Sequence, residues 1–228
     1  MARTEFDIVV IGGGAGGLVV AAGGASLGAK VALVEKRRLG GDCLWTGCVP
    51  SKTLIKSAQV AHAMRHADRW ALSPHDPKPN LARVMERVAS VIRGIEPNDS
   101  PERFRSLGVD VILGDGRFVA PDTFEVNGRR LTAKTFVIAT GSRPAMPPIS
   151  GLATAGALTN ETLFELPDAP PSLAILGGGP IGCEMAQAFA RLGVEVTLVE
   201  AVERILPREE PEASAVITEA LAADGVVV

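Results

Sequence analysis

The hydrophobic residues of the chain form short continuous runs that occur twice in the same order. Asp7–Ile11 leads into a glycine-rich segment, and a second apolar run ends at Leu33–Glu35. Leu173–Leu176 leads into another glycine-rich segment, and its second run ends at Leu198–Glu200. Continuous apolar runs of this kind are typical of parallel strands buried on both faces of a sheet. We therefore predict a strand, a tight turn, a helix and a second strand in each copy.

The two copies agree in spacing as well as in order. Each carries a Gly-x-Gly-x-x-Gly motif, formed by Gly12, Gly14 and Gly17 in the first copy and by Gly177, Gly179 and Gly182 in the second. The closing glutamate, Glu35 or Glu200, follows the first glycine by 23 residues, and a Leu-Gly pair follows that glycine by 15. This common register indicates an internal repeat.

The three glycines of such a motif have separate physical uses. The first permits a tight turn, the second lets a pyrophosphate approach the backbone, and the third packs the helix against the strand. Phosphate then lies at the helix N-terminus, and a carboxylate at Glu35 or Glu200 can accept hydrogen bonds from ribose hydroxyls. Each copy therefore predicts a dinucleotide site. The alternative is a glycine-rich turn in an α/β fold that binds no ligand.

These elements predict an α/β protein with two Rossmann-like dinucleotide-binding domains, the second of them incomplete. We expect the first domain over residues 1–148 and the second over 149–228, because Pro144–Gly151 is typical of a linker. Gly225–Val228 reads as the opening of a third strand in the second domain. Thr123–Val126 and Arg129–Ala133 flank an Asn-Gly pair, which favours a hairpin with a type I′ turn.

Composition narrows the classes of function. Of the 228 residues, 46% are apolar and 21% charged, which is typical of a globular protein. The net charge of -3 argues against a nucleic-acid partner. Ile8–Ala29 is uncharged over 22 residues, but eight of them are glycine, so we predict no membrane span. No secretory signal pattern is found, and we expect a cytoplasmic protein.

Two of the three cysteines, Cys43 and Cys48, follow the first copy almost at once. Pro50 is tolerated only near a helix start, so we predict the pair at the N-terminal end of a helix that continues through Ala61. That position should lower the pKa of a thiol through the helix dipole and unpaired N–H groups. A redox-active pair is favoured over inert thiols and over zinc, which needs four ligands.

The segment Gly40–Lys52, with its pattern Gly-Gly-x-Cys-x4-Cys-Val-Pro-Ser-Lys, resembles the active-site motif of the class I pyridine nucleotide–disulfide oxidoreductases. This family includes lipoamide dehydrogenase, glutathione reductase and mercuric reductase. Thr135–Pro144 is similar to the family's second flavin-contacting segment, and Gly114–Phe118 to the segment whose backbone meets the adenine of FAD. The resemblance covers nearly the whole chain.

The resemblance implies that the first copy binds FAD and the second binds NAD. The FAD residues that it implies are Gly12, Gly14, Gly17, Glu35, Lys36, Gly41, Lys52, Gly116, Ala139, Thr140 and Gly141. The NAD residues that it implies are Gly177, Gly179, Gly182 and Glu200. We expect NAD rather than NADP because Glu200 would repel a 2′-phosphate and Ala201 offers no arginine to receive one.

The resemblance also implies catalytic roles in passing electrons from NADH through FAD to the cysteines. Cys48 would face the flavin and form a charge-transfer pair with it when reduced, and Cys43 would exchange with a small-molecule or protein disulfide. Lys52 would lie near flavin N5 and pair with Glu184, so that it is not an isolated buried cation. The alternative for Lys52 and Glu184 is two solvated helix charges.

Three residues depart from the commoner family pattern. Asp42 stands where a threonine usually supports the FAD pyrophosphate, and a carboxylate there would repel the phosphates unless it is turned away. Trp45 replaces an asparagine between the cysteines, and Pro180 stands where some members carry an aromatic residue. None of these changes removes a reacting group.

Members of this family continue beyond the part that matches here, with a dimerisation domain that carries a His-x4-Glu pair as acid–base partner of the cysteines. None of the three histidines, His62, His66 and His75, has a glutamate five residues on. We expect the N-terminal half of a homodimeric FAD-dependent disulfide oxidoreductase, inactive by itself. The alternatives are a mercuric reductase-like enzyme and a truncated flavin-binding fragment without catalysis.

The remaining candidate residues favour structural roles. Cys183 falls within the predicted helix of the second copy and is expected to be a buried small hydrophobe. His62 and His66 lie one helical turn apart and could share a metal, but Arg65 and Asp68 beside them favour a solvated helix face. We predict no metal site.

Overall fold

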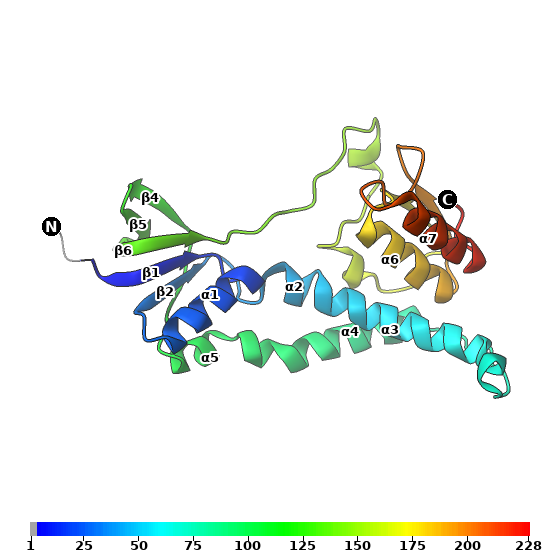
Figure 1. Ribbon diagram of the computed structural model, residues 1–228, viewed down its shortest axis with the longest axis horizontal. Helices are drawn as coiled ribbons and strands as arrows, with labels where there is room; N and C mark the ends of the chain where they lie inside the picture. The colour runs from blue at the N-terminus through cyan, green and yellow to red at the C-terminus, as the bar shows by residue number, and fades with distance from the viewer. Residues whose placement is uncertain (1–3) are drawn as a thin grey trace. The chain divides into compact units, whose positions relative to one another are not determined.

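The computed structural model describes residues 4–228, and Figure 1 shows the order of its helices and strands. The chain forms two compact units. The first contains the residues up to Pro50 together with Ser90–Leu163, and the second contains Ser51–Ala89 together with Phe164–Val228. The predicted division into nucleotide domains at residue 148 stays a prediction.

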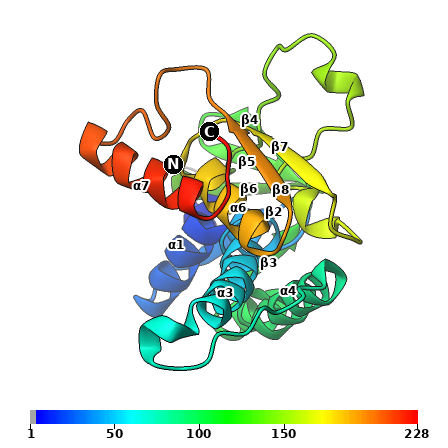
Figure 2. The ribbon, with the colours of Figure 1, turned by 90° about the vertical axis from the view of Figure 1, so that its right-hand side faces the viewer.

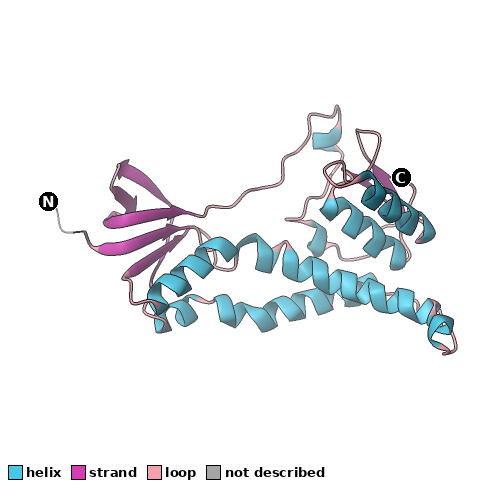
Figure 3. Cartoon of the chain, viewed as in Figure 1, coloured by secondary structure: helices cyan, strands magenta, loops and turns pink. Residues whose placement is uncertain are grey.

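The first unit is built around a sheet with helices beside it (Figure 3). Its strands are β1 (Phe6–Ile11), β2 (Val31–Glu35), β3 (Asp110–Leu113), β4 (Gly116–Ala120), β5 (Thr123–Val126) and β6 (Arg129–Ile138). Its helices are α1 (Ala15–Ser26), α2 (Gly41–Trp45) and α5 (Pro101–Ser106), with 3-10 helices η2 (Glu96–Asp99) and η3 (Leu152–Thr154). Helices α3 (Cys48–Arg65) and α4 (Leu81–Ile95) and the 3-10 helix η4 (Leu163–Glu165) include residues of both units.

The six strands pair in the order β3-β2-β1-β6-β5-β4. Strand β1 is parallel to β2 on one side and to β6 on the other, and β2 is parallel to β3. Because the chain goes from β1 to β2 on one side and reaches β6 on the other, β1 is the point at which the strand order changes direction. Ligands of open α/β sheets bind beyond the carboxyl ends of the strands at such a point.

The sheet buries apolar side chains on both faces, as the continuous runs predicted. Val10 and Leu33 lie on one face and pack with Leu18 of α1 and Phe104 of α5. On the other face, one cluster joins β1, β2 and the antiparallel strands; it consists of Phe6, Val9, Ala32, Val34, Phe124, Val126, Leu131 and Ala133. Neighbouring residues of β1 and β2 thus point to opposite faces of the sheet. Because both faces are buried, a polar residue at alternate positions of either strand would be buried too.

Strand β6 belongs to two kinds of pairing. Its first part pairs antiparallel with β5, with Phe124 opposite Leu131, and its second part pairs parallel with β1. The predicted hairpin is confirmed: Asn127 and Gly128, between the strands, have φ of 49° and 76°, as a type I′ turn requires. One long strand thus links the hairpin to the centre of the sheet.

The second unit contains the second copy of the repeat. Its elements, besides most of α3 and part of α4, are η1 (Ala67–Trp70), β7 (Ser172–Leu176), α6 (Pro180–Arg191), β8 (Glu195–Val199) and α7 (Pro211–Ala223). Strands β7 and β8 are parallel, α6 packs on both, and α7 packs on α6 (Figure 2). Val227 forms a parallel bridge with Thr197, which confirms the predicted opening of a third strand.

Pro144–Gly151, predicted as the linker between the two domains, contains no helix or strand and lies within the first unit, so its role as a linker stays a prediction. Ser73–Pro79 is an irregular loop. Among residues 4–228, no helix combines the length and the apolar character that crossing a bilayer would require.

Two glycines of α1 differ sharply in their surroundings. A Cβ on Gly17 would collide with the carbonyl oxygen of Gly12, whereas a Cβ on Gly16 would meet no atom within 4 Å. The helix can therefore approach the turn after β1 only because Gly17 has no side chain.

We expect Gly17→Ala to lower the free energy of unfolding by about 1–3 kcal/mol or more, since backbone must move to admit the methyl group. Gly16→Ala is the matched control; it should raise the same free energy by about 0.5–1 kcal/mol, because alanine is the better helix former. Denaturant unfolding of the purified chain measures both. Equal effects of the two substitutions would contradict the close packing at Gly17.

Candidate functional site

The first glycine turn lies at the carboxyl ends of β1 and β6. Gly12 has φ of +107°, and its N–H donates to the carbonyl oxygen of Val34 at 2.8 Å. A Cβ on Gly12 would collide with the carbonyl oxygen of Ala139, whose own N–H donates to Ile11 at 2.8 Å. Glycine is thus required at position 12 by both its backbone angle and its contact with the end of β6.

Helix α1 begins beside a second glycine-rich segment. Gly14 is its N-cap and offers no side-chain hydrogen bond to the first turn of the helix. A Cβ on Gly41 would lie 2.5 Å from the Cα of Gly14, and the N–H of Gly40 donates to the carbonyl oxygen of Gly13 at 2.9 Å. Two bare backbone segments therefore face each other, which fits the close approach that a pyrophosphate makes to a glycine-rich backbone.

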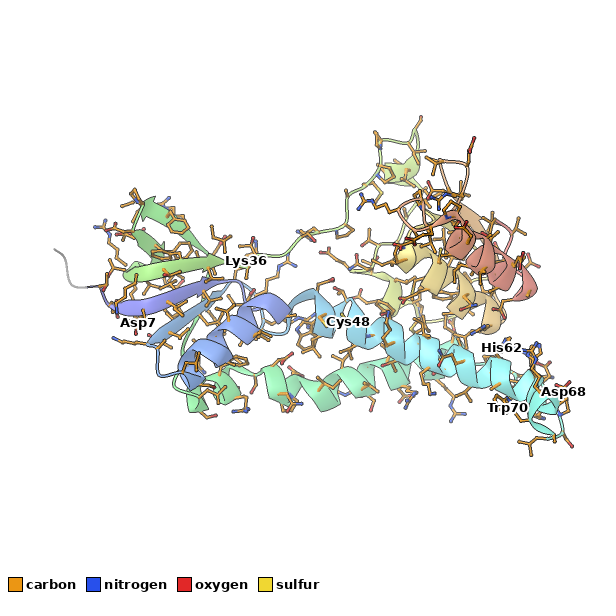
Figure 4. The ribbon with its side chains drawn as sticks, viewed as in Figure 1. Asp7, Lys36, Cys48, His62, Asp68 and Trp70 are labelled. Atoms are coloured by element: carbon orange, nitrogen blue, oxygen red, sulfur yellow. The ribbon has the colours of Figure 1, made fainter. Side chains whose placement is uncertain are left out.

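Glu35 is attached to this turn. Its carboxylate accepts hydrogen bonds from the N–H groups of Gly13 and Arg37, each at 2.7 Å. Its carbonyl oxygen accepts from the N–H of Gly114 at 2.8 Å, which brings the predicted adenine-contacting segment with Gly116 to the end of β2. Lys36 extends from the same strand end (Figure 4).

The structure thus gathers most of the predicted FAD residues at one edge of the first sheet. They are Gly12, Gly14, Gly17, Glu35, Lys36, Gly41, Gly116, Ala139, Thr140 and Gly141. Their backbones and the absence of side chains at the turn fit a dinucleotide. Their roles as FAD ligands stay predictions.

The second glycine turn repeats the backbone angle and the helix contact of the first, although a Cβ on Gly177 would meet no atom within 4 Å. Gly177 has φ of +104° and donates its N–H to the carbonyl oxygen of Val199 at 2.8 Å. A Cβ on Gly182 would collide with the carbonyl oxygen of Gly177, and Gly179 is the uncapped N-cap of α6. The fold of the predicted NAD residues therefore matches the fold of the first copy, and their role as NAD ligands stays a prediction.

Glu200 occupies the place in the second turn that Glu35 has in the first. Its carboxylate accepts hydrogen bonds from the N–H groups of Gly178 and Ala201, each at 2.7 Å, and from Val202 at 3.3 Å. Hydrogen bonds from the backbone of Gly178 and Ala201 lower the pKa of Glu200 below its ordinary value. The carboxylate is therefore ionised at the end of β8.

Cys43 lies in the short helix α2, and Cys48 is the first residue of α3, as Figure 4 shows for Cys48. The predicted helix start near Pro50 is confirmed. The expected lowering of the thiol pKa is wrong for Cys43. A hydrogen bond with Cys48, followed by burial, raises the pKa of Cys43 to about 11. Each effect favours the protonated thiol, and α2 is too short to oppose them.

Lys52 and Glu184 form the predicted pair within the second unit. The Lys52 Nζ donates to both carboxylate oxygens of Glu184, at 2.7 and 2.6 Å. The two side chains retain 59% and 40% of their exposure, so the pair is worth at most about 1 kcal/mol of stability. It borders a cavity of about 340 Å³ lined by Lys52, Ile55, Ala58, Gln59, Glu184, Gln187, Ala188 and Arg191.

Trp45, between the two cysteines, is fixed by its neighbours. Its indole Nε1–H donates to the carbonyl oxygen of Leu39 at 2.7 Å, and the Arg38 guanidinium lies 3.5 Å from the ring centroid. The Asp42 carboxylate accepts hydrogen bonds from Thr46 and Asn160. The sequence comparison with the family pattern identified Trp45 and Asp42 as unusual. It did not predict their partners, because Asn160, which bonds to Asp42, lies far along the chain.

The prediction of a solvated helix face for His62 and His66 is wrong. The rings stack at 4.2 Å between centroids, and His62 Nδ1 lies 3.0 Å from Oδ1 of Asp224. Asp224 is 6% exposed at its side chain and accepts further hydrogen bonds from Gln187 and Arg191. Across the described part of the chain, no group of three or more His, Cys, Asp or Glu side chains could hold a metal.

The prediction for Cys183 is confirmed. This residue is 7% exposed in α6, and its Sγ donates to the carbonyl oxygen of Gly178 at 3.4 Å. Burial raises the pKa of its thiol, so it is an inert core residue.

The chain matches the family model for the pyridine nucleotide-disulphide oxidoreductases over residues 6–228. The Rossmann-type sheet, with a glycine turn at its switch point and a cysteine pair close by in the chain, is an arrangement of the kind that binds dinucleotides. The chain belongs to the pyridine nucleotide-disulphide oxidoreductase family.

Individual relatives agree with this assignment. A mercuric reductase from Lysinibacillus sphaericus is 36% identical over 98% of this chain, and a dihydrolipoyl dehydrogenase from Bacillus subtilis is 36% identical over 92%. The chain covers 41% and 47% of these two proteins. Among solved structures, the HOCl-induced flavoprotein disulfide reductase RclA from Escherichia coli matches with a TM-score of 0.82 and 31% identity, over 97% of this chain and 48% of that one.

The contact of His62 with Asp224 predicts a pH-dependent stability. Burial and the positive charge of Arg191 lower the pKa of His62 below 6.5, more than the charge of Asp224 raises it. The unfolded chain therefore takes up this proton first as the pH falls. The stability that neutral His62 contributes should be complete above its unfolded pKa and decline as the pH falls through 6.5 toward the lower folded pKa.

We expect His62→Gln to reduce this decline, measured as the free energy of unfolding from pH 8 down to the lower pKa, because glutamine cannot take up the proton. His75→Gln, in the exposed loop Ser73–Pro79, is the matched control and should leave the decline unchanged. If the free energy of unfolding declined as steeply in His62→Gln as in the native chain, groups other than His62 would be responsible for the decline.

Proposed function

We propose that the protein is the flavin-binding part of an oxidoreductase that passes electrons from NADH through FAD to the Cys43–Cys48 pair and on to a disulfide. The observation that carries the proposal is the hydrogen-bonded pair of thiols, which follows directly on a dinucleotide-type glycine turn in the same unit. The chain spans less than half the length of the two relatives named above, so the activity of the whole protein is part of the proposal.

FAD would be held by the first glycine turn. In this proposal the N–H groups at the start of α1 bind the pyrophosphate, and Glu35 accepts hydrogen bonds from the adenosine ribose. Gly116 and Ala139–Gly141 would contact the rest of the cofactor from the neighbouring strand ends. When bound, FAD would supply two-electron chemistry between the nicotinamide and the cysteines.

The two thiols would have different roles. Cys48, at the N-terminus of α3, would face the flavin, and Cys43 would exchange with the disulfide substrate. The raised pKa of Cys43 supports a proton held on this sulfur in the reduced pair. Since the thiolate is the nucleophile in disulfide exchange, Cys43 needs a base to remove that proton before it attacks.

The ion pair of Lys52 and Glu184 supports a role at the cofactor more than a role in stability. An exposed ion pair contributes little to folding, yet this one is bidentate and well formed. We propose that Lys52 stabilises negative charge on the reduced cofactor and that Glu184 holds the lysine in position. NAD would bind the second turn at Gly177–Gly182, with Glu200 at its ribose, and the full protein would act as a homodimer.

A second candidate function is the reduction of a metal ion bound by the same cysteines. Mercuric reductases are among the relatives, and one solved structure of RclA is described as a Cu(II) complex. Paired thiols also suit soft metal ions. Turnover of mercuric ion by the NADH-dependent protein, without turnover of any disulfide, would favour this candidate.

The cysteine roles predict different spectra for two variants. With FAD bound, Cys48→Ser should lose the long-wavelength charge-transfer absorbance on reduction. Cys43→Ser should show this absorbance before any reductant is added, because its Cys48 thiolate has no disulfide partner and the flavin is oxidised. Absorbance spectra recorded before and during anaerobic reduction by NADH measure both variants; in Cys43→Ser the two electrons stay on the flavin, so its band should fade as NADH is added.

Cys183→Ala serves as the matched control, because this thiol is buried in α6, and its spectra should match those of the native protein. Spectra that are alike in Cys43→Ser and Cys48→Ser would contradict the assigned roles. Failure of the chain to bind FAD would contradict the proposed function itself.

Glu200 predicts the choice of nicotinamide cofactor. Its ionised carboxylate should repel a 2′-phosphate, so Glu200→Arg should shift the ratio of NADH to NADPH affinity toward NADPH by about tenfold or more. Glu200→Gln is the matched control, because it keeps an acceptor for the N–H of Gly178 but removes the charge. Dissociation constants for the two nucleotides measure the shift. Equal affinity of the native protein for both would contradict the prediction.

A further inference from the structure

We propose that Asp42 is a positioning residue that closes the loop between Cys43 and Cys48 and thereby favours the disulfide between them. The proposal rests on the redox role proposed above for the two cysteines. It adds a residue outside the pair that determines how readily the pair is oxidised.

The Asp42 carboxylate joins two separate donors. Its Oδ1 accepts a hydrogen bond from the Thr46 hydroxyl and another from Nδ2 of Asn160 at 2.9 Å. The N–H of Thr46 also donates to the carbonyl oxygen of Asp42 at 2.9 Å. Since Thr46 lies between the cysteines, these bonds draw the loop back onto the residue that precedes Cys43.

Gly47, directly before Cys48, is packed against the same side chain. A Cβ at this position would lie 3.0 Å from both the carbonyl oxygen and Oδ2 of Asp42. That distance is shorter than most carbon–oxygen contacts, so a side chain at position 47 would require Asp42 or the loop to shift by a few tenths of an ångström. Asp42 therefore contacts the loop at Thr46 through hydrogen bonds and at Gly47 through packing.

Asn160 anchors the loop to another part of the first unit. Its amide also donates to the carbonyl oxygen of Thr46 at 3.4 Å. The next residue, Glu161, forms a bidentate pair with Arg143 at 3.0 and 2.8 Å, and Arg143 follows shortly after the end of β6. Bidentate arginine–carboxylate pairs hold a defined geometry. Asn160 is thus part of a segment that is itself tied to the sheet.

Closing this loop should favour the disulfide for an entropic reason. Oxidation brings two sulfur atoms together and orders the residues between them, which costs conformational entropy. Where Asp42, Thr46 and Asn160 already order those residues in the dithiol, less entropy remains to be lost. Ordering the loop takes an oxygen acceptor at position 42 and does not depend on its charge, so Asp42→Asn and Asp42→Ala should behave differently.

The test is the equilibrium of the purified chain with glutathione. Glutathione disulfide oxidises the two thiols, so that one protein disulfide and two molecules of reduced glutathione form. We expect Asp42→Ala to lower this equilibrium constant about tenfold, equivalent to a potential about 30 mV less negative. Asp42→Asn should stay close to the native value. Alkylation of the remaining thiols after acid quench, read by mass spectrometry, measures the oxidised fraction.

Asp122→Ala is the matched control, because it also breaks an aspartate–hydroxyl bond, to Thr123 at 3.0 Å, in the turn between β4 and β5. It should leave the equilibrium unchanged. Thermal unfolding checks that each variant is folded. If Asp42→Ala fails to fold, Thr46→Val and Asn160→Ala each remove one donor, and each should lower the constant by a smaller factor.

The outcomes separate this proposal from the proposed function. If native Cys43 and Cys48 form no disulfide with each other, the proposed function fails. If they do, and folded Asp42→Ala has the native equilibrium constant, the role of Asp42 is overturned and the proposed function stands. An equal decrease in Asp42→Asn and Asp42→Ala would also overturn it, because the charge and not the closed loop would then be responsible.

Discussion

The close backbone contact between the glycine turn and the strand ends is the constraint on which the first unit depends. Gly12 can lie against the carbonyl of Ala139, and Gly17 against that of Gly12, only because neither has a side chain. This contact lets α1 cover the sheet, and the start of the helix at Gly14 carries no side-chain cap. The carboxylate of Glu35 then ties the turn to the end of β2. The second copy repeats the contact between helix and turn, at Gly182 and Gly177, but a Cβ on Gly177 would meet no atom within 4 Å, so the contact with a further strand end belongs to the first copy.

Polar interactions in the second unit differ in what they contribute. The ion pair of Lys52 and Glu184 is exposed, so water screens it and it adds little to stability. Asp224, by contrast, is nearly buried and is balanced by Arg191, Gln187 and His62. Burial disfavours its carboxylate, but the hydrogen bonds from Arg191 and Gln187 more than compensate and lower its pKa. The buried cluster therefore contributes to the packing of the second unit, whereas the exposed pair contributes little to it.

The cysteine pair shows how local contacts override a general rule. A thiol at a helix N-terminus is expected to lose its proton more easily, but Cys43 lies in a helix of five residues and bonds to Cys48. The hydrogen bond and burial act on a single proton at short range, so they outweigh a weak dipole. The proposed role of Asp42 is also a local one. The geometry of the loop, more than the electrostatic field around it, would determine how readily Cys43 and Cys48 form a disulfide.

The sequence by itself determined the parts of this protein that depend on neighbours along the chain. The strands and helices of both copies, the hairpin at Asn127 and Gly128, and the helix after Cys48 follow from apolar periodicity and from the backbone needs of glycine and proline. Only the tertiary structure decided which distant side chains meet. Asn160 reaches Asp42, and Asp224 reaches His62, across more than a hundred residues of sequence. No local pattern encodes such contacts, because a polar side chain finds its partner only after packing has brought the segments together.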